Sequence, residues 1–217
     1  MWNDALQKAA RARLVAGKLG GMGEEFARHL AEKPSYEFRW KTWRGERVNI
    51  RLLPLLRHMT EGHCAYCDWF PMDTGTDPTI AHFRPKKPFP KQVYAWDNLY
   101  LCCRQCQEKN DNRFTEELLR PDEPGYAFER FFIYNHADGT LSPNPGAPEE
   151  EHRRAELTID LFRLNSRGRP QARKRTRKLF LHLMSENRKG WIPELPFRYL
   201  FQDESSDFPP RSGYVAS

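Results

Sequence analysis

The strongest constraint in the sequence is a pair of Cys-x-x-Cys motifs, formed by Cys64 with Cys67 and by Cys103 with Cys106. A Cys-x-x-Cys turn brings two thiolates close enough to hold one edge of a tetrahedral zinc ion, and a second pair some tens of residues later completes a four-sulfur site. The segment between the motifs is too short and too polar to form its own core, so a bound ion would supply much of its folding free energy. We therefore predict a structural zinc ion held by these four cysteines.

Other metal-ligating side chains lie close to the motifs. Because four cysteines already satisfy zinc, His58 and His63 are interpreted as structural or surface residues. Cys102 is adjacent to the second pair but out of register with it, and we interpret it as a packed thiol.

Composition narrows the class of protein. The chain has 217 residues, a hydrophobic content of 39% and a net charge of +6, with a pI near 9.1. These values indicate a folded protein and favour an acidic partner, of which nucleic acid is the usual candidate, although a basic surface can also be merely soluble. The sequence has neither a run of about 18 apolar residues nor a signal-peptide pattern. We expect no membrane association and a cytoplasmic location, where cysteines are metal ligands more often than disulfides.

Patterning predicts an α+β chain in three parts: a helical extension over 1–60, a zinc-bound core over 61–120, and a helical region over 121–217 that carries a basic helix and a tail rich in Pro and aromatic residues. Helical spacing predicts helices over 3–16, 48–59, 104–117 and 149–164. Alternation predicts a short strand over 79–83 and another within 123–139 that enters a turn at its end. The glycines between residues 17 and 23 predict a loop.

One histidine lies between the two halves of the predicted zinc site. The strand over 79–83 places His82 at its end, next to three cations, Arg84, Lys86 and Lys87. Gln107 and Asp111 are four residues apart, so they would share one face of the predicted helix over 104–117. That face begins beside the zinc ion and would point back toward His82. The strand, the loop that contains Asn98 and the helix are therefore predicted to form one pocket.

This arrangement resembles the HNH, or ββα-metal, endonucleases, which carry a histidine on a hairpin, a central asparagine and a polar ligand on the helix after the last cysteine. The segments His82-Phe-Arg-Pro-Lys86 and Tyr94-x-Trp96-x-Asn98-Leu-x-Leu101 are similar to those of the HNH proteins of the Septu and retron antiphage systems, often called PtuB. Weaker similarity extends over about residues 50–178. The resemblance implies a zinc-stapled ββα-metal core with flanking helices.

The resemblance also implies a reaction and partners. His82 would be the general base that activates water for attack on a phosphodiester, and Asn98 would orient the loop carrying it. Mg²⁺ or Mn²⁺, held by Gln107 and Asp111, would stabilise charge on the phosphate. Arg84, Lys86 and Lys87 would bind the backbone of the DNA or RNA substrate. The expected partner is a PtuA-type ATPase, in some systems together with a retron reverse transcriptase and its nucleic acid.

Two departures from the family pattern leave two interpretations open. The position before the histidine, usually an acidic metal ligand, is Ala81, and the position after the last cysteine, usually Asn or His, is Gln107. One interpretation is an active nuclease with a rearranged ion site. The other is a catalytically disabled zinc module that binds nucleic acid or an ATPase partner.

Two features near the C-terminus also allow alternatives. Seven of the twelve residues from 167 to 178 are basic, which suits contact with a polyanion, while the other side of the same helix would pack inward. Trp191, Phe197, Tyr199 and Phe201 belong to a tail that is either a strap over the core or a docking segment for a partner.

Overall fold

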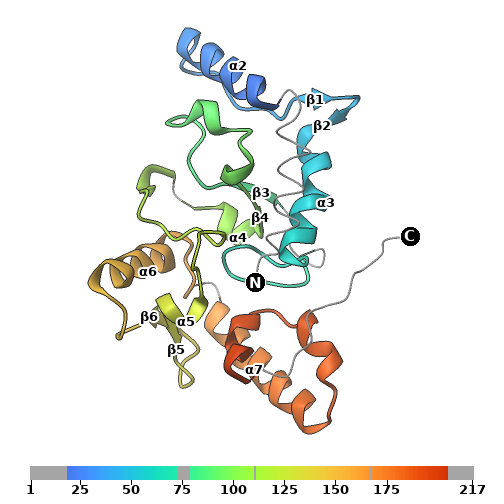
Figure 1. The fold of residues 1–217 in the computed structure, drawn as a ribbon, viewed down its shortest axis with the longest axis vertical. Helices are drawn as coiled ribbons and strands as arrows, with labels where there is room; N and C mark the ends of the chain where they lie inside the picture. Colours follow the sequence, from blue (N-terminus) through green and yellow to red (C-terminus); the bar gives the residue numbers. More distant parts are fainter. Residues whose placement is uncertain (1–18, 73–78, 110, 167, 205–217) are drawn as a thin grey trace.

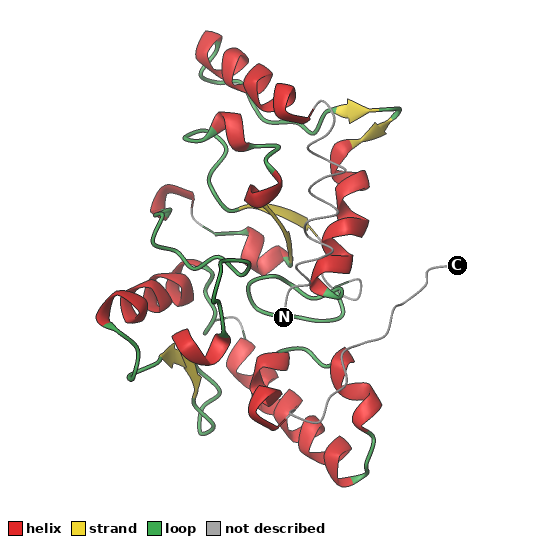
Figure 2. Ribbon diagram, in the orientation of Figure 1, coloured by secondary structure: helices red, strands yellow, loops and turns green. Residues whose placement is uncertain are grey.

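The computed structural model describes residues 19–72, 79–109, 111–166 and 168–204 (Figure 1). Its strands pair into small antiparallel sheets of two strands each: β1 (Thr42–Trp43) with β2 (Glu46–Arg47), β3 (Thr79–His82) with β4 (Leu99–Cys102), and β5 (Phe132–Tyr134) with β6 (Leu141–Pro143). Helices make up most of the remaining regular structure (Figure 2). The predicted α+β class is confirmed.

The N-terminal helix corrects one prediction. The glycines up to residue 23 were expected to form a loop, but α2 (Leu19–Glu32) runs through Gly21 and Gly23. A Cβ atom added at Gly23 would lie 2.2 Å from the carbonyl oxygen of Lys91, in the 3₁₀ helix η1 (Pro90–Gln92). Glycine therefore allows α2 to approach η1 closely, which outweighs its low helix propensity. The helix expected over 3–16 lies outside the described residues.

The helix predicted over 48–59 is confirmed as α3 (Val48–Thr60). Its apolar side, which includes Leu52, Leu56 and Met59, is buried. Glu61 closes the helix in the left-handed conformation, and its backbone N–H bonds to carbonyls of the last turn. The chain then passes directly into the first Cys-x-x-Cys turn.

The β3–β4 hairpin lies near the middle of the molecule (Figure 1). Ala81 pairs with Tyr100 and His82 with Leu99, and all four residues of β4 are buried. Helix α3 packs against both strands, and the short helix α4 (Arg104–Gln107) packs against β3. The 3₁₀ helix η2 (Trp96–Asn98) leads into β4. The hairpin thus fixes His82 and the second cysteine pair relative to each other.

The helix predicted over 104–117 is wrong in its length. Helix α4 ends at Gln107, and the 3₁₀ helix η3 (Asp111–Arg113) follows. Asn and Asp, which dominate residues 110–112, compete with helical backbone hydrogen bonds and favour turns. Gln107 and Asp111 consequently do not share a helix face. The side chain of Asp111 lies outside the described part of the chain.

The C-terminal part contains α5 (Phe128–Phe131), α6 (Glu149–Leu161), α7 (Arg169–Ser185) and the 3₁₀ helices η4 (Lys189–Glu194) and η5 (Arg198–Glu204). The helix expected over 149–164 ends at Leu161, and the strand expected within 123–139 is confirmed as β5, which follows α5. Core residues from the N-terminal, central and C-terminal parts, among them Leu19, Leu101 and Phe162, belong to one buried cluster. Among the described residues, no helix is both long enough and apolar enough to span a bilayer.

Candidate metal centre and histidine site

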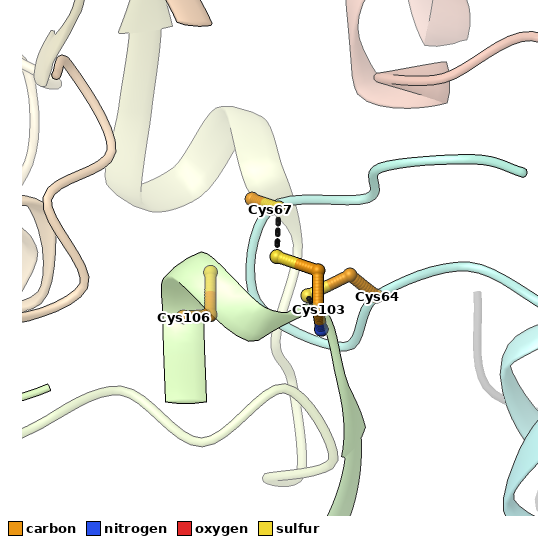
Figure 3. Close-up of side chains that lie close together, drawn as sticks. All are labelled: Cys64, Cys67, Cys103 and Cys106. Atoms are coloured by element: carbon orange, nitrogen blue, oxygen red, sulfur yellow. Dashed lines mark hydrogen bonds between the residues drawn. The ribbon is translucent and has the colours of Figure 1, made fainter. Parts of the chain in front are cut away.

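The four cysteines of the two motifs come together in one buried cluster (Figure 3). Their Sγ atoms all lie within 4.8 Å of one another, and the sulfurs of Cys67 and Cys103 are 3.7 Å apart. Zn–S bonds of about 2.3 Å in a tetrahedron place sulfurs roughly 3.8 Å apart, whereas a disulfide needs about 2.05 Å. The cluster therefore fits a metal ion such as zinc.

Backbone hydrogen bonds hold the two turns in place. The Cys64 N–H donates to the Trp69 carbonyl at 3.0 Å, and the Asp68 N–H donates to the Cys64 carbonyl at 2.9 Å, which closes the first turn. The Ala65 N–H donates to the carbonyl of Leu101 in β4 at 2.9 Å, and the Cys103 N–H lies 3.4 Å from the Cys64 sulfur. The hairpin that carries His82 is thereby joined to the metal centre.

A buried arginine from α7 contacts the cluster. Nη2 of Arg169 lies 3.0 Å from the sulfur of Cys106, while Nη1 donates to the carbonyls of Phe162 and Arg163 at 2.7 and 2.8 Å. Burial alone would lower the pKa of this guanidinium, but the neighbouring cysteine sulfurs raise it, so Arg169 stays charged. No local sequence signal points to this contact, because Arg169 is one of many cations in a basic run.

The basic run from 167 to 178 is therefore not a uniform surface for a polyanion. Besides Arg169, Arg173 is fully buried and donates to the carbonyls of Leu164 and Gly139 and to the hydroxyl of Tyr199. Lys174, Arg175 and Lys178 are the exposed cations among the described residues of this run, and Arg167 lies outside them. Two of the seven cations in the predicted charge cluster, Arg169 and Arg173, thus stabilise the fold.

His82 lies at the end of β3, and its ring nitrogens differ in environment. Nε2 donates to the carbonyl of Val93 at 2.9 Å, a contact that in the neutral imidazole leaves the lone pair on Nδ1. The ring is covered by two aromatic side chains from the segment before β1. Trp40 stacks on it at 5.5 Å between centroids, and Phe38 meets it edge-on at 5.2 Å.

Asn98 is fully buried and fixes the loop that follows His82. Its Oδ1 accepts from the Arg84 N–H at 2.6 Å, and its Nδ2 donates to the Gln92 carbonyl at 3.0 Å. Its own carbonyl accepts from the Phe83 N–H at 2.9 Å. One asparagine therefore ties both ends of the 83–98 connection to the hairpin.

The other side of β3 faces α4. The Thr79 hydroxyl donates to the Cys102 carbonyl at 2.9 Å and to Oε1 of Gln107 at 3.4 Å. Strand alternation puts Thr79 and Ala81 on the same face and His82 on the opposite one. Gln107 thus lies on the face of Ala81 and not directly against His82. Just beyond the end of β3, the ammonium of Lys109 donates to the Phe83 carbonyl at 3.1 Å.

The three cations expected to contact a nucleic acid have different surroundings. Arg84 forms a two-pronged ion pair with Glu116, at 2.7 and 2.9 Å, and this carboxylate raises the pKa of its guanidinium. The Lys86 ammonium lies 5.6 Å from the centroid of Phe38, and Lys87 is exposed. Of these three cations, Arg84 is therefore the one whose charge is offset by a carboxylate, that of Glu116.

The C-terminal tail crosses the first cysteine turn. The Phe197 N–H donates to the Asp68 carbonyl, the Leu195 carbonyl contacts Nε2 of His63, and Arg198 pairs with Asp68 at 2.7 Å. Phe197 and Phe201 are buried, whereas Trp191 is 54% exposed. From Leu195 to Phe201 the tail is a strap over the core, and His63, which is buried beneath it, is a structural residue.

No protein-family model matches the sequence, and a search of the curated proteins found no match.

Proposed function

We propose that this protein is a metal-dependent HNH-type endonuclease that hydrolyses phosphodiester bonds of DNA or RNA, and that it acts as the effector of an antiphage system with a PtuA-type ATPase. In this proposal His82 is the general base and Asn98 positions its loop. Zinc holds the four cysteines, and a second ion, Mg²⁺ or Mn²⁺, with Gln107 as a ligand, stabilises the charge that develops on the phosphate.

The observation that supports this proposal most strongly is the environment of His82. A carbonyl partner at 2.9 Å on Nε2 fixes the tautomer that a neutral general base requires, with Nδ1 as the proton acceptor. Asn98 holds the same loop from both ends. The hairpin that carries His82 leads directly into the second cysteine pair and the short helix α4, an order of elements that is consistent with this proposal.

The surroundings of Ala81 and Lys109 favour a second function. In this alternative the protein is a zinc module without catalysis that binds nucleic acid or an ATPase. Ala81 offers no ligand for a catalytic cation, and the ammonium of Lys109 bonds to the carbonyl of Phe83, the residue that follows His82. A positive side chain at this place weakens the binding of a divalent cation through Coulomb repulsion. Arg84 is also already paired with Glu116.

One experiment separates the two functions. The protein, alone and together with the ATPase encoded beside it, is incubated with supercoiled plasmid and with RNA in Mg²⁺ or Mn²⁺. Cleavage that requires both the ion and His82 supports the nuclease, with His82→Ala as the comparison and equal zinc content in both proteins. Binding of the nucleic acid or of the ATPase, with no ion-dependent cleavage under any condition, supports the module and overturns the nuclease.

A further inference from the structure

The histidine at the centre of the proposed site is closed off from solvent. His82 is 6% exposed, and its Nδ1 is buried. Its Nε2 is engaged with the Val93 carbonyl. A general base must lie within hydrogen-bond reach of the water or hydroxyl whose proton it takes. His82 cannot meet this requirement in the conformation described here.

Two side chains of one segment lie over the imidazole. We call residues 33–41, between α2 and β1, the aromatic arm. Its Trp40 stacks on the His82 ring with 26° between the planes, and its Phe38 approaches the same ring edge-on. Phe38 also lies under the Lys86 ammonium. The arm therefore covers both the candidate base and a cation that could contact a phosphate.

We propose that the aromatic arm is a movable cover, and that it must lift from His82 and Lys86 before the phosphate backbone of a nucleic acid can reach them. This inference rests on the proposed nuclease function, because it concerns access to the same histidine. In the free protein the arm is closed over His82, and opening of the arm is a step that precedes cleavage.

The arm has the composition of a segment that can open locally. It contains neither helix nor strand, and Lys33, Pro34, Ser35, Glu37 and Arg39 are exposed. Segments with few buried contacts and exposed backbone open at a lower free energy than the global unfolding of the protein. The neighbouring α2 is anchored on η1 through the close approach at Gly23, so the arm can lift as a loop between fixed ends.

One hydroxyl group forms two of the hydrogen bonds that attach the arm. The Tyr94 hydroxyl accepts from the Lys41 N–H at 3.0 Å and donates to the Arg39 carbonyl at 3.2 Å. The Tyr94 ring also packs against Phe38 and Trp40. Tyr94→Phe removes the two hydrogen bonds but keeps the ring, so this variant loosens the arm with little risk to the fold.

The test measures the accessibility of His82 without relying on nuclease activity. Diethyl pyrocarbonate modifies accessible imidazoles, and mass spectrometry reports the modification of each histidine. In the wild type, we expect slow modification of His82 compared with the exposed His152. In Tyr94→Phe, His82 should react roughly 5- to 150-fold faster, the range that follows from loss of two net hydrogen bonds. The matched control is Tyr134→Phe, in β5, which should leave the rate at His82 unchanged.

Amide hydrogen exchange of the wild-type protein provides a second measurement that needs no variant. We expect the amides of residues 35–41 to exchange well before those of β4. Exchange of the arm as slow as that of β4, or an unchanged rate at His82 in Tyr94→Phe, would show that the arm is a fixed part of the core and would overturn the proposal. If Tyr94→Phe exposes His82 and no nucleic acid is cut, the cover stands and the nuclease function is what fails.

Discussion

The guanidinium of Arg169 lies 3.0 Å from the sulfur of Cys106, so the first turn of α7 is attached to the candidate metal centre. A zinc ion with four thiolates carries a net charge of −2, and a buried cation beside it offsets part of that charge. The same guanidinium also caps the carbonyls of Phe162 and Arg163 near the end of α6. Arg169 therefore links three elements that are otherwise separate in the sequence.

Replacing Arg169 by Met should weaken zinc binding by roughly 10- to 100-fold, the usual effect of losing a partner that hydrogen-bonds to a metal ligand. Competition with a chromophoric chelator measures this change. The control is Arg175→Met, an exposed position on the same helix, which should bind zinc as the wild type does. Equal affinities for the two variants would contradict the role given to Arg169.

The two adjacent cysteines Cys102 and Cys103 should respond differently to substitution. Cys103→Ala removes one of the four clustered sulfurs, so we expect loss of zinc and of cooperative unfolding, because metal binding and folding are coupled at such a site. Cys102→Ala should retain one zinc ion per chain, because Cys102 is outside the cluster. Elemental analysis and thermal unfolding provide the readouts, and loss of zinc in Cys102→Ala would refute the assignment.

Zinc affinity should also fall as the pH decreases. Burial raises the pKa of the Cys106 thiol, so protons compete with the ion for this sulfur. Because the thiol must lose its proton to bind zinc, each step toward acid makes binding less favourable. Chelator competition between about pH 6 and 8 measures the effect. An affinity that does not change over this range would contradict thiolate ligation.

Local spacing revealed the cysteine cluster, since each Cys-x-x-Cys turn is formed by neighbouring residues and only the meeting of two turns depends on the fold. The motif around Asn98 likewise allowed its position, in the connection between His82 and the second cysteine pair, to be predicted from the sequence. The contacts of Arg169 and Trp40 could not, because each depends on how a distant segment packs, and one arginine in a basic run looks like the next. The early end of α4 shows that an Asn- and Asp-rich stretch should have limited the predicted helix.

Asn98 should contribute strongly to stability. Asn98→Ala removes the acceptor of the Arg84 N–H and the donor to the Gln92 carbonyl inside the core, and it should lower the free energy of unfolding by about 2–4 kcal/mol. Asn144→Ala is the control, because Asn144 also bonds to backbone groups but at an exposed site, where about 1 kcal/mol is expected. Urea denaturation measures both, and similar losses would argue against a special role for Asn98.

The strap formed by the C-terminal tail should depend on the charge of Asp68. This carboxylate accepts from the Arg198 N–H at 2.6 Å and pairs with the guanidinium at 2.7 Å, and Glu61 binds the same guanidinium. Asp68 has a φ of 54°, a conformation that Asn also tolerates, so Asp68→Asn removes the charge without backbone strain. Because one partner of a largely buried pair is lost, we expect a decrease of about 1–3 kcal/mol in the free energy of unfolding.

The two parts of this prediction can be measured separately. Hydrogen exchange should accelerate at residues 195–201 in Asp68→Asn, while zinc content stays at one ion per chain, since Asp68 does not belong to the sulfur cluster. The exposed Asp138→Asn, which removes the charge of a carboxylate that accepts from Thr140, should leave the stability close to that of the wild type. Unchanged exchange in the strap would mean that the buried rings of Phe197 and Phe201, and not the ion pair, hold the tail against the first cysteine turn.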